Sequence, residues 1–566
     1  MQLQGKQQQG IKAWFKGGEP LIWANAAAVT VSTLAVIGLL ILLAVRGFSH
    51  FWPADVFVAS YDLPERSSAI VMAERVESEE VAIEQLTSAG FVLDTEDSFI
   101  QRELVKVGNR DVSGADFRWV LSRYLKNSEF PEDAVVLERR EWGNFYGFLR
   151  GVKEAGQRQE YSDDAALWAD FQQRIERAEA IHDDIERIEK KAIGAVNYRL
   201  EKLRLRERSL ALDEELPDAK RAQRQLEIDS ERAELDAEYK VLQKELNGLY
   251  AQWNRDSFVM ETAQGQRREQ RVSTVVQAYR PNAMSSLDKV GFYFAKFGEF
   301  LSEEPREANT EGGIFPAIFG TVIMVLIMSI MVTPFGVIAA VYLREYAKQG
   351  LMTRIVRIAV NNLAGVPSIV YGVFGLGFFI YFVGAEIDQA LFPEALPSPT
   401  FGTPGLLWAS VTLALLTLPV VIVATEEGLA RIPRNLREGS LALGATKAET
   451  LWRVVLPMTS PAMMTGLILA VARAAGEVAP LMLVGVVKLA PSLPVDGNFP
   501  YFHLDQKFMH LGFHIYDVGF QSPNVEAARP LVYATALLLV VIIALLNLSA
   551  VALRNHLREK YKSLEM

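Results

Sequence analysis

Six apolar segments of membrane-spanning length divide this chain of 566 residues. One helical crossing of a lipid bilayer needs about twenty predominantly apolar residues, and each segment has that length. The segments cover residues 21–45, 315–343, 355–383, 406–424, 462–487 and 531–553. Backbone polar groups in lipid must be hydrogen-bonded within the chain, so each segment is predicted to be a helix. The sequence therefore predicts a mostly α-helical, polytopic membrane protein with six transmembrane helices.

The first apolar segment raises the question of a signal peptide. Its apolar region is longer than that of a signal peptide, and no cleavage site between small residues precedes Arg46. We therefore interpret residues 21–46 as an uncleaved first transmembrane helix, which follows an N-terminal tail of residues 1–20.

Positive side chains gather on one side of the predicted spans. Lysine and arginine are enriched in cytoplasmic loops, so their distribution predicts orientation. The loop at 384–404 carries only acidic charges, whereas the other short loops and both ends are basic. The basic residues are Lys6, Lys12, Lys16, Arg344, Lys348, Arg354, Arg357, Arg431, Arg434, Arg437, Lys447, Arg453, Arg554, Arg558, Lys560 and Lys562. Both termini, with the tail 554–566, are thus predicted to be cytoplasmic, and residues 47–313 are predicted to lie outside, in the periplasm if the cell has one.

The polar block of residues 47–313 has two parts. Alternating apolar and polar runs between about 55 and 160 favour an α+β domain. Between about 162 and 254, apolar residues recur at three- and four-residue steps on both sides of Pro217. This pattern is typical of an antiparallel helical hairpin with a coiled-coil seam. We interpret the hairpin as a spacer or docking arm without chemistry of its own.

Composition excludes several classes of site and partner. The sequence contains no cysteine, so it forms no disulfide and no cysteine-ligated metal site. A net charge of −10 argues against a nucleic-acid partner. His503, His510 and His514 lie near Asp505 and Asp517, but no third ligand joins the helical pair 510 and 514. No metal or cofactor is predicted, and this loop is expected to cap a pore or to meet a binding protein.

The loop at 426–461, between the fourth and fifth spans, is too long and too patterned for a simple turn. Pro433 can begin a helix, and Gly444 permits a tight bend between two short helical pieces. A short helix held at the membrane surface by two spans can fit a groove of a partner protein.

Residues of this loop resemble the "EAA" loop of ABC-importer permeases. The resemblance rests on Glu438, on Gly444 six residues later, and on Leu456 with Pro457 at the end of the pattern. It implies a coupling helix that docks on an ATPase subunit. The sequence departs from the family pattern by small changes: Gly439 and Ser440 stand for two alanines and Val454 for an isoleucine.

Other stretches resemble a narrower family, the permeases of phosphate-specific ABC importers. "GGIFPAIFGTVIMVLIMSIMVTPFG" and "RAAGEVAPL" carry this resemblance, and the ending "SPNVEAARPLVYATALLLVV" is similar to the A-type subunit. The resemblance covers about residues 312–561 and the first span, and it implies the ABC-importer permease fold for a permease domain of residues 314–553 with five transmembrane helices. Shorter members lack the large outer domain, so the role of that domain is not implied.

The resemblance also implies a location in the bacterial inner membrane, with residues 47–313 in the periplasm, and it implies partners. They are a C-type phosphate permease that forms a heterodimer with this chain, two copies of an ATP-binding subunit, a periplasmic phosphate-binding protein, and membrane lipid. The sequence contains no Walker A pattern, so ATP hydrolysis is expected on the partner, and this chain is expected to be a non-catalytic permease.

The pair Arg473 and Glu477 lies within the fifth apolar segment. An arginine at the centre of a span costs about 2.5–3.5 kcal/mol on insertion scales. Glu477, four residues later, would share its helix face, and Gly476 allows bending or close approach. One interpretation is a buried ion pair that joins helices. The other is a pore wall, where the arginine fork binds an oxyanion and the carboxylate accepts a hydrogen bond from the O–H of phosphate but repels sulfate.

Two alternative functions remain open on the sequence alone. The first is a permease for another oxyanion, such as sulfate or molybdate. The second is a membrane-anchored sensor or scaffold that uses its helical hairpin as a reporter; the EAA-like loop argues against it.

Overall fold

The computed structural model describes residues 18–561, except 65–67, 89, 91–92, 95–96 and 523–524. Residues 1–17 and 562–566 of the predicted tails, with Lys6, Lys12, Lys16 and Lys562, lie outside the described residues.

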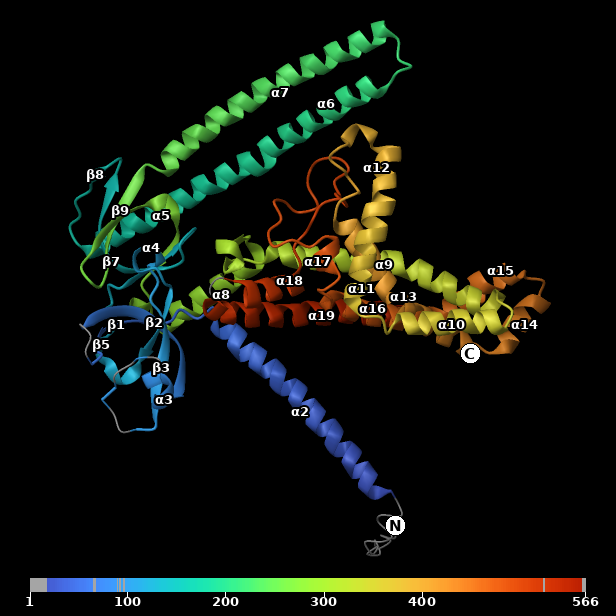
Figure 1. Ribbon diagram of the computed structural model, residues 1–566, viewed down its shortest axis with the longest axis horizontal. Coiled ribbons are helices and arrows are strands. Elements are labelled where there is room, and N and C mark those ends of the chain that lie inside the picture. The colour runs from blue at the N-terminus through green and yellow to red at the C-terminus, as the bar shows by residue number, and fades with distance from the viewer. Residues whose placement is uncertain are drawn as a thin grey trace, which may run out of the picture.

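A bundle of long apolar helices forms the largest part of the molecule (Figure 1). Within the described residues, six helices are long and apolar enough to cross a membrane, which confirms the predicted fold class. They are Pro20–Ser49, Phe315–Tyr346, Ser368–Leu391, Leu406–Arg431, Lys447–Gly476 and Ala528–Glu559. The helices that build them are α2 (Glu19–Ser49), α9 (Phe315–Val341), η6 (Tyr342–Tyr346), α11 (Ser368–Phe374), η7 (Gly375–Gly384), α12 (Ala385–Leu391), α13 (Leu406–Arg431), α15 (Lys447–Thr450), η9 (Leu451–Val455), α16 (Leu456–Gly476) and α19 (Val525–Tyr561).

Helix α13 is the centre of the bundle. It packs against α9 on one side and α16 on the other, and α16 packs in turn against α19. Small residues let these helices approach closely: a Cβ on Gly466 of α16 would lie 2.7 Å from the Ala424 side chain of α13. Small residues at helix contacts are typical of membrane bundles, where tight packing replaces the hydrophobic effect.

Two predicted spans are wrong at one end because the helix breaks there. The third was predicted over 355–383, but α10 (Leu351–Leu363) ends first and Pro367 is the N-cap of α11. The fifth was predicted over 462–487, but α16 ends at Gly476. Pro480 has no N–H, and its ring occupies the space that a helix would give to the Gly476 carbonyl. Apolar sequence continues past both prolines, and hydropathy alone therefore misplaced these ends.

Short elements follow the broken fifth span. They are α17 (Leu481–Val484), α18 (Leu511–Tyr516) and η10 (Asp517–Gln521), and the loop of residues 485–510 between α17 and α18 is called the cap loop below. The helix η8 (Pro393–Ala395) lies between the third and fourth spans, and α14 (Arg434–Ala442) between the fourth and fifth.

Two antiparallel sheets form the domain between α2 and α9. The first has the strand order β4-β3-β2-β1-β5 and the second β10-β9-β7-β6-β11, with β8 beside β7. The strands are β1 (Val56–Tyr61), β2 (Ala69–Ala82), β3 (Phe99–Lys106), β4 (Phe117–Leu121), β5 (Leu125–Glu129), β6 (Val135–Arg139), β7 (Phe145–Glu154), β8 (Gln157–Arg158), β9 (Asp256–Glu261), β10 (Arg267–Arg271) and β11 (Val275–Tyr279). The short pair β12 (Pro305–Arg306) and β13 (Glu311–Gly312) leads into α9. Short helices join the strands: α3 (Ile83–Ser88), α4 (Arg110–Ser113), η1 (Ser122–Tyr124), η3 (Val272–Thr274), η4 (Pro281–Ala283), α8 (Ser286–Ser302) and η5 (Glu307–Asn309).

A long helical hairpin is inserted into the second sheet. It consists of α5 (Asp164–Glu186), η2 (Arg187–Ile193), α6 (Gly194–Leu212) and α7 (Asp218–Trp253). The chain leaves the sheet after the short strand β8 and returns in β9, which is the neighbour of β7, with Glu154 opposite Asp256. The strand region therefore extends to residue 279, well beyond the predicted limit near residue 160.

The two ends of this hairpin are packed in different ways. Phe171 and Ile175 of α5 are buried with Phe258 in the core of the second sheet. The part of the hairpin beyond Glu186 is called the arm below, and within it η2 and α6 pack along α7 through a seam that includes Leu203 and Leu235. Figure 1 shows α6 as the arm helix nearer to the bundle.

Candidate functional site

The loop between α13 and α16 folds as two short helical pieces. Helix α14 begins after Pro433, and Gly444 stands in the bend that follows it with φ of 88°. The Thr446 hydroxyl and the Glu449 carboxylate form a capping box that begins α15. The hydroxyls of Ser440 and Thr450 are 2.9 Å apart and join the two pieces. The bend therefore depends on a left-handed residue, which glycine adopts without strain.

The predicted coupling residues divide into an exposed and a packed group. Glu438, Gly439 and Gly444 are exposed, whereas Ser440, Val454, Leu456 and Pro457 are partly buried. Pro457 is the second residue of α16, directly after η9 in the continuous helix Lys447–Gly476. Exposed apolar side chains accompany the first group: Leu441, Leu443 and Trp452, of which Leu443 is 91% exposed. The loop thus presents an apolar knob to its surroundings.

Arg437 fixes this loop to the bundle, and sequence reasoning used it only as a positive charge. Its guanidinium donates to the carbonyl oxygens of Leu429 at 2.8 Å and Ile432 at 2.9 Å. It also donates to the Glu345 carboxylate at 2.9 Å. Carbonyl groups at the end of a helix lack partners within it, and a cation there is favourable. The position of Arg437 shortly after the end of α13 could have indicated its contact with the carbonyl groups there. Glu345 is 92 residues away, so no local spacing indicates that partner.

Arg473 and Glu477 meet at the end of α16 and not in the middle of a continuous helix. Arg473 lies in the last turn, and Glu477 is the C-cap with extended backbone. The predicted shared helix face is therefore wrong, although the side chains still approach to 3.6 Å. Gly476 has open space around its Cβ position. The two side chains are 35% and 21% exposed in this chain, so the pair is long and accessible rather than tightly buried.

The two helix breaks of the bundle lie against each other. A Cβ on Gly372 of α11 would lie 2.7 Å from Cα of Pro480. The Tyr371 hydroxyl donates to the carbonyl oxygen of Leu363, at the end of α10, at 2.6 Å. The segment that carries Arg473 and Glu477 is thereby placed beside the other interrupted helix. Interrupted helices at membrane depth are tolerated where protein covers them or where they line a cavity.

The histidines near the cap loop do not converge on one point. His503 lies 2.8 Å from Asp496, and Nδ1 of His510 accepts a hydrogen bond from the Gly512 N–H at 3.1 Å. His514 is buried near Asp517. In the part of the chain that the structure describes, no group of three or more His, Cys, Asp or Glu side chains could hold a metal.

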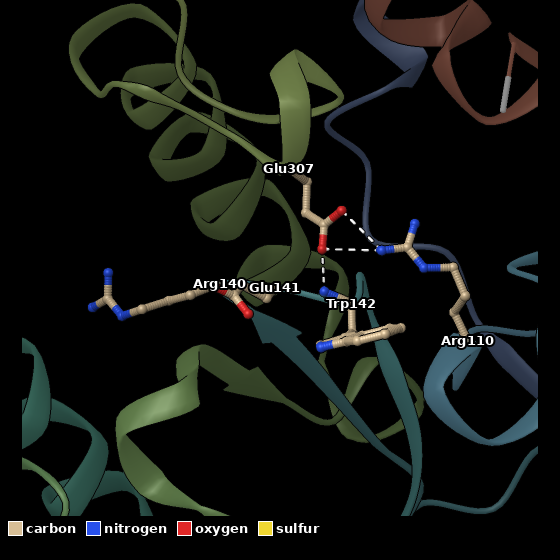
Figure 2. A pocket seen from close by; sticks show the side chains of 5 residues that line it. All are labelled: Arg110, Arg140, Glu141, Trp142 and Glu307. Carbon is tan, nitrogen blue, oxygen red and sulfur yellow. Dashed lines mark hydrogen bonds and ion pairs between the residues drawn. The ribbon is translucent and has the colours of Figure 1, made fainter. Parts of the chain in front are cut away.

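A hollow of about 460 Å³ lies in the sheet domain, where that domain meets the segment leading into α9. Figure 2 shows Glu307 between Arg110 and Trp142, with Arg140 directed away from them. Arg110 binds the Glu307 carboxylate at 2.9 Å, and Arg140 binds Glu179 at 2.6 Å. Each arginine is thus neutralised by a carboxylate, and the hollow is a joint between parts of the chain rather than a charged binding site.

The same segment also reaches the membrane part. Asn309 donates to the Lys488 carbonyl oxygen at 2.9 Å and to the Asp517 carboxylate at 3.3 Å. Lys488 lies 3.1 Å from Asp517. The sheet domain is therefore joined to the cap loop through two side chains of one short segment, Glu307 on the domain side and Asn309 on the bundle side.

Comparison with known proteins identifies the family. The model described as "binding-protein-dependent transport system inner membrane component" matches residues 332–563. The phosphate transport system permease protein PstA 1 of Mycobacterium tuberculosis is 34% identical over 244 residues, which are 43% of this chain and 71% of that protein. The chain belongs to the PstA family of permeases. PstA of Mycobacterium leprae is 36% identical over 269 residues, which are 47% of this chain and 79% of that protein.

This PstA-type permease was also compared with solved structures of other proteins. A chain of the inward-facing MetNI methionine ABC transporter superposes with a TM-score of 0.32 and 20% identity, covering 43% of this chain and 94% of that one. The family match, from residue 332, includes the α14–α15 loop and the Arg473–Glu477 pair. The sheets and the hairpin lie before it, so this PstA-type permease joins a family membrane domain to a large second domain.

Proposed function

We propose that this PstA-type permease imports inorganic phosphate as the A-type subunit of an ABC importer. The observation that carries the proposal is the similarity to two mycobacterial permeases whose names state phosphate transport. The family match at residues 332–563 includes every residue that the sequence singled out for coupling or for the substrate path.

The proposed orientation places α14 and α15 in the cytoplasm and the sheets outside the inner membrane. Figure 1 shows these two parts at opposite ends of the bundle. Arg431, Arg434 and Lys447 lie at the α14 end, whereas the loop with η8 carries acidic residues and no basic ones. Positive residues favour the cytoplasmic side, so charge supports this orientation.

The α14–α15 loop would couple ATP hydrolysis on a partner subunit to movement of the membrane helices. The exposed Leu443 and Leu441 beside the bend at Gly444 form the kind of knob that fits an apolar groove of a partner. We assign this groove to a separate ATP-binding subunit, present in two copies, and regard this chain as a non-catalytic permease. The C-type permease would complete the pore, and a periplasmic phosphate-binding protein would deliver the anion.

The substrate path would pass Arg473 and Glu477. A guanidinium binds an oxyanion through paired N–H groups. A neighbouring carboxylate disfavours sulfate, which carries no proton at neutral pH, but it can accept a hydrogen bond from the protonated oxygen of phosphate. The long 3.6 Å separation and partial exposure of the pair leave both groups available to an anion.

Uptake of radiolabelled phosphate by vesicles containing the assembled complex tests the substrate. We expect ATP-dependent uptake that excess sulfate or molybdate leaves unchanged. Competition by either anion as effective as that of unlabelled phosphate would instead favour a permease for another oxyanion. Vesicles that carry the Arg473→Gln variant serve as the matched control for uptake by other routes.

Copurification tests the transporter class itself. An affinity-tagged chain should retain an ATPase subunit and a second permease after mild detergent extraction. A tagged chain that is fully membrane-inserted but binds no ATPase would contradict the proposal and favour a sensor or scaffold.

A further inference from the structure

The arm contacts the permease at a point far away in sequence. Tyr198 of α6 donates a hydrogen bond to the carbonyl oxygen of Phe499 in the cap loop. The Lys202 ammonium lies 4.7 Å from the centre of the Tyr198 ring and 5.5 Å from that of Phe499. The Tyr198 ring also meets His503 edge to face at 6.4 Å. Tyr198 and Lys202 thus supply a hydroxyl, an aromatic ring and a cation from one short stretch of α6, and each of these groups contacts the cap loop.

A second loop on the same side of the bundle touches the same helix. Helix α6 lies against η8, which follows the third span, as well as against the cap loop, which follows the fifth. The arm thus contacts two loops that follow different membrane helices. A change in the distance between those helices would therefore change the geometry of this contact.

The contact can open without exposing an apolar core. Phe499 is 67% exposed although it touches the arm, and its partners Tyr198 and Lys202 are only partly buried. The arm keeps its own seam, in which Leu203 and Leu235 are buried. Exposed polar and cation–π contacts contribute about 0.5–1 kcal/mol each, so a few of them hold two parts together reversibly.

The hydrogen bonds of the cap loop allow a displacement of its tip to move its base. Near the tip, His503 binds Asp496 at 2.8 Å, so this part moves as one piece. At the base, the carbonyl oxygens of Leu504 and Gln506 accept the first two N–H groups of α13 at 2.8 and 2.9 Å. The other end of the loop continues from α17, directly after Pro480 and the helix break at Glu477. A displacement at Phe499 therefore acts on the central helix and on the segment of the proposed substrate path.

The base of the hairpin, from which the arm extends, is held firmly in the sheet domain. Arg174 of α5 binds Asp256 of β9 at 2.7 Å, and Phe171 is fully buried under the second sheet. Because the sheet domain is also tied to the bundle through Glu307 and Asn309, the arm can hold the cap loop in place against a fixed support.

We propose that the arm is an outer latch of the transporter. The contact of Tyr198 and Lys202 with Phe499 and His503 holds the outer end of the permease in the conformation described here, and it opens and closes once in each transport cycle. This gives the large insertion a function, control of the outer mouth, and it rests on the proposed transport function.

This chain contains no cysteine, so two introduced cysteines are its only thiols, and the test uses the assembled complex. The double variant Tyr198→Cys/Phe499→Cys is joined with a short bis-thiosulfonate reagent that a reductant removes. A matched control, Arg206→Cys/Glu231→Cys, joins α6 to α7 across an exposed ion pair of 3.2 Å and leaves the latch free. ATP turnover and phosphate uptake are measured before linking, after linking and after reduction.

Linking the latch should lower turnover and uptake together by about tenfold or more, since an equilibrium locked in one state cannot cycle. Reduction should restore both, and the control link should change neither. Equal turnover of the linked and unlinked latch variant would overturn the proposal. If the unlinked complex hydrolyses ATP but takes up no phosphate, the proposed substrate fails, while the ratio of linked to unlinked turnover still decides the latch.

Discussion

Arg437 on α14 and Glu345 in η6, which continues α9, are joined at 2.9 Å, and the same guanidinium binds two carbonyl oxygens at the end of α13. Three helices thus meet at one side chain. The coupling loop is therefore not a loose segment between two spans, because any displacement of α14 by a docked partner is transmitted to α9 and α13 together.

The first prediction concerns this junction. Arg437→Gln should leave Glu345, which is 14% exposed, without its cation, at a cost of about 1–3 kcal/mol. Stimulation of the partner ATPase by loaded binding protein should fall at least severalfold while membrane insertion persists. Arg434→Gln, on the exposed face of the same helix, is the control. Full stimulation in the Arg437→Gln complex would mean that the junction does not transmit movement.

The second prediction tests whether the bend needs glycine at position 444 for its backbone conformation or for the lack of a side chain. Gly444 and Gly439 both have open surroundings, but only Gly444 has positive φ, at +88°. Gly444→Val should therefore be strained by about 1–2 kcal/mol or more and misdirect Leu443, whereas Gly439→Ala should be tolerated. Stimulated ATP hydrolysis in complexes of equal assembly measures the difference. Normal stimulation with valine at position 444 would refute the assigned role of the bend.

The third prediction concerns the proposed pore pair. Arg473→Gln should reduce phosphate uptake severely, because Glu477 then repels the anion alone. Glu477→Gln should preserve uptake but weaken discrimination against sulfate. If the pair only joins helices, the double variant Arg473→Leu/Glu477→Leu should transport nearly normally, since removal of both partners leaves no lone charge. Uptake per assembled complex is the measurement, and near-normal uptake by the double variant would sink the pore assignment.

The fourth prediction distinguishes the arm from the base of the hairpin. Replacing residues 194–246 by a short turn should leave the sheet domain folded, because Glu189 and Tyr250, 2.8 Å apart, keep the cut ends together. Deleting residues 162–254 should unfold the domain, since it removes the buried Phe171 and Ile175, at about 2–5 kcal/mol for each large side chain. Limited proteolysis of both variants tests this. Equal protease resistance of the two would contradict the described core.

The fifth prediction concerns pH. Burial lowers the pKa of His510 to about 3 and that of His514 to about 4, although Asp517 favours the charged form of the latter. Between pH 6.5 and 4 only the unfolded chain gains these protons, so folding stability falls by up to about 1.4 kcal/mol per pH unit for each histidine as the pH decreases. Above pH 6.5 this dependence vanishes.

Thermal unfolding between pH 7.5 and 5 in detergent measures this effect. His510→Asn retains an acceptor for the Gly512 N–H and should flatten the pH dependence of Tm. The exposed His556→Asn is the control. An unchanged slope in His510→Asn would show that this histidine is protonated in the folded state.

Hydropathy predicted the existence of all six membrane helices because apolar length is a local property. It misplaced two ends, since Pro367 and Pro480 interrupt helices inside apolar runs that continue past them. The two prolines themselves indicate where a helix can break. The prediction relied instead on the apolar composition of about twenty residues.

Non-local pairing set the other limit on what could be read from the sequence. Strand β9 pairs with β7 across an insertion of about one hundred residues, and no pattern near Asp256 indicates that partner. Arg437 and Tyr198 illustrate the same limit for side chains. The residues that hold them, Glu345 and Phe499, lie 92 and 301 positions away, and one sequence contains no signal that links them.

The adjacency of β7 and β9 has a consequence for how this domain can vary. Because the hairpin enters and leaves the sheet between neighbouring strands, equal insertions in α6 and α7 would change nothing in the strand register. Each added pair of seven-residue repeats would carry the tip about 10 Å farther from the sheet. The length of the hairpin alone therefore sets how far from the sheet the tip reaches, and the hairpin can be lengthened or shortened while the strand register and the pore stay the same.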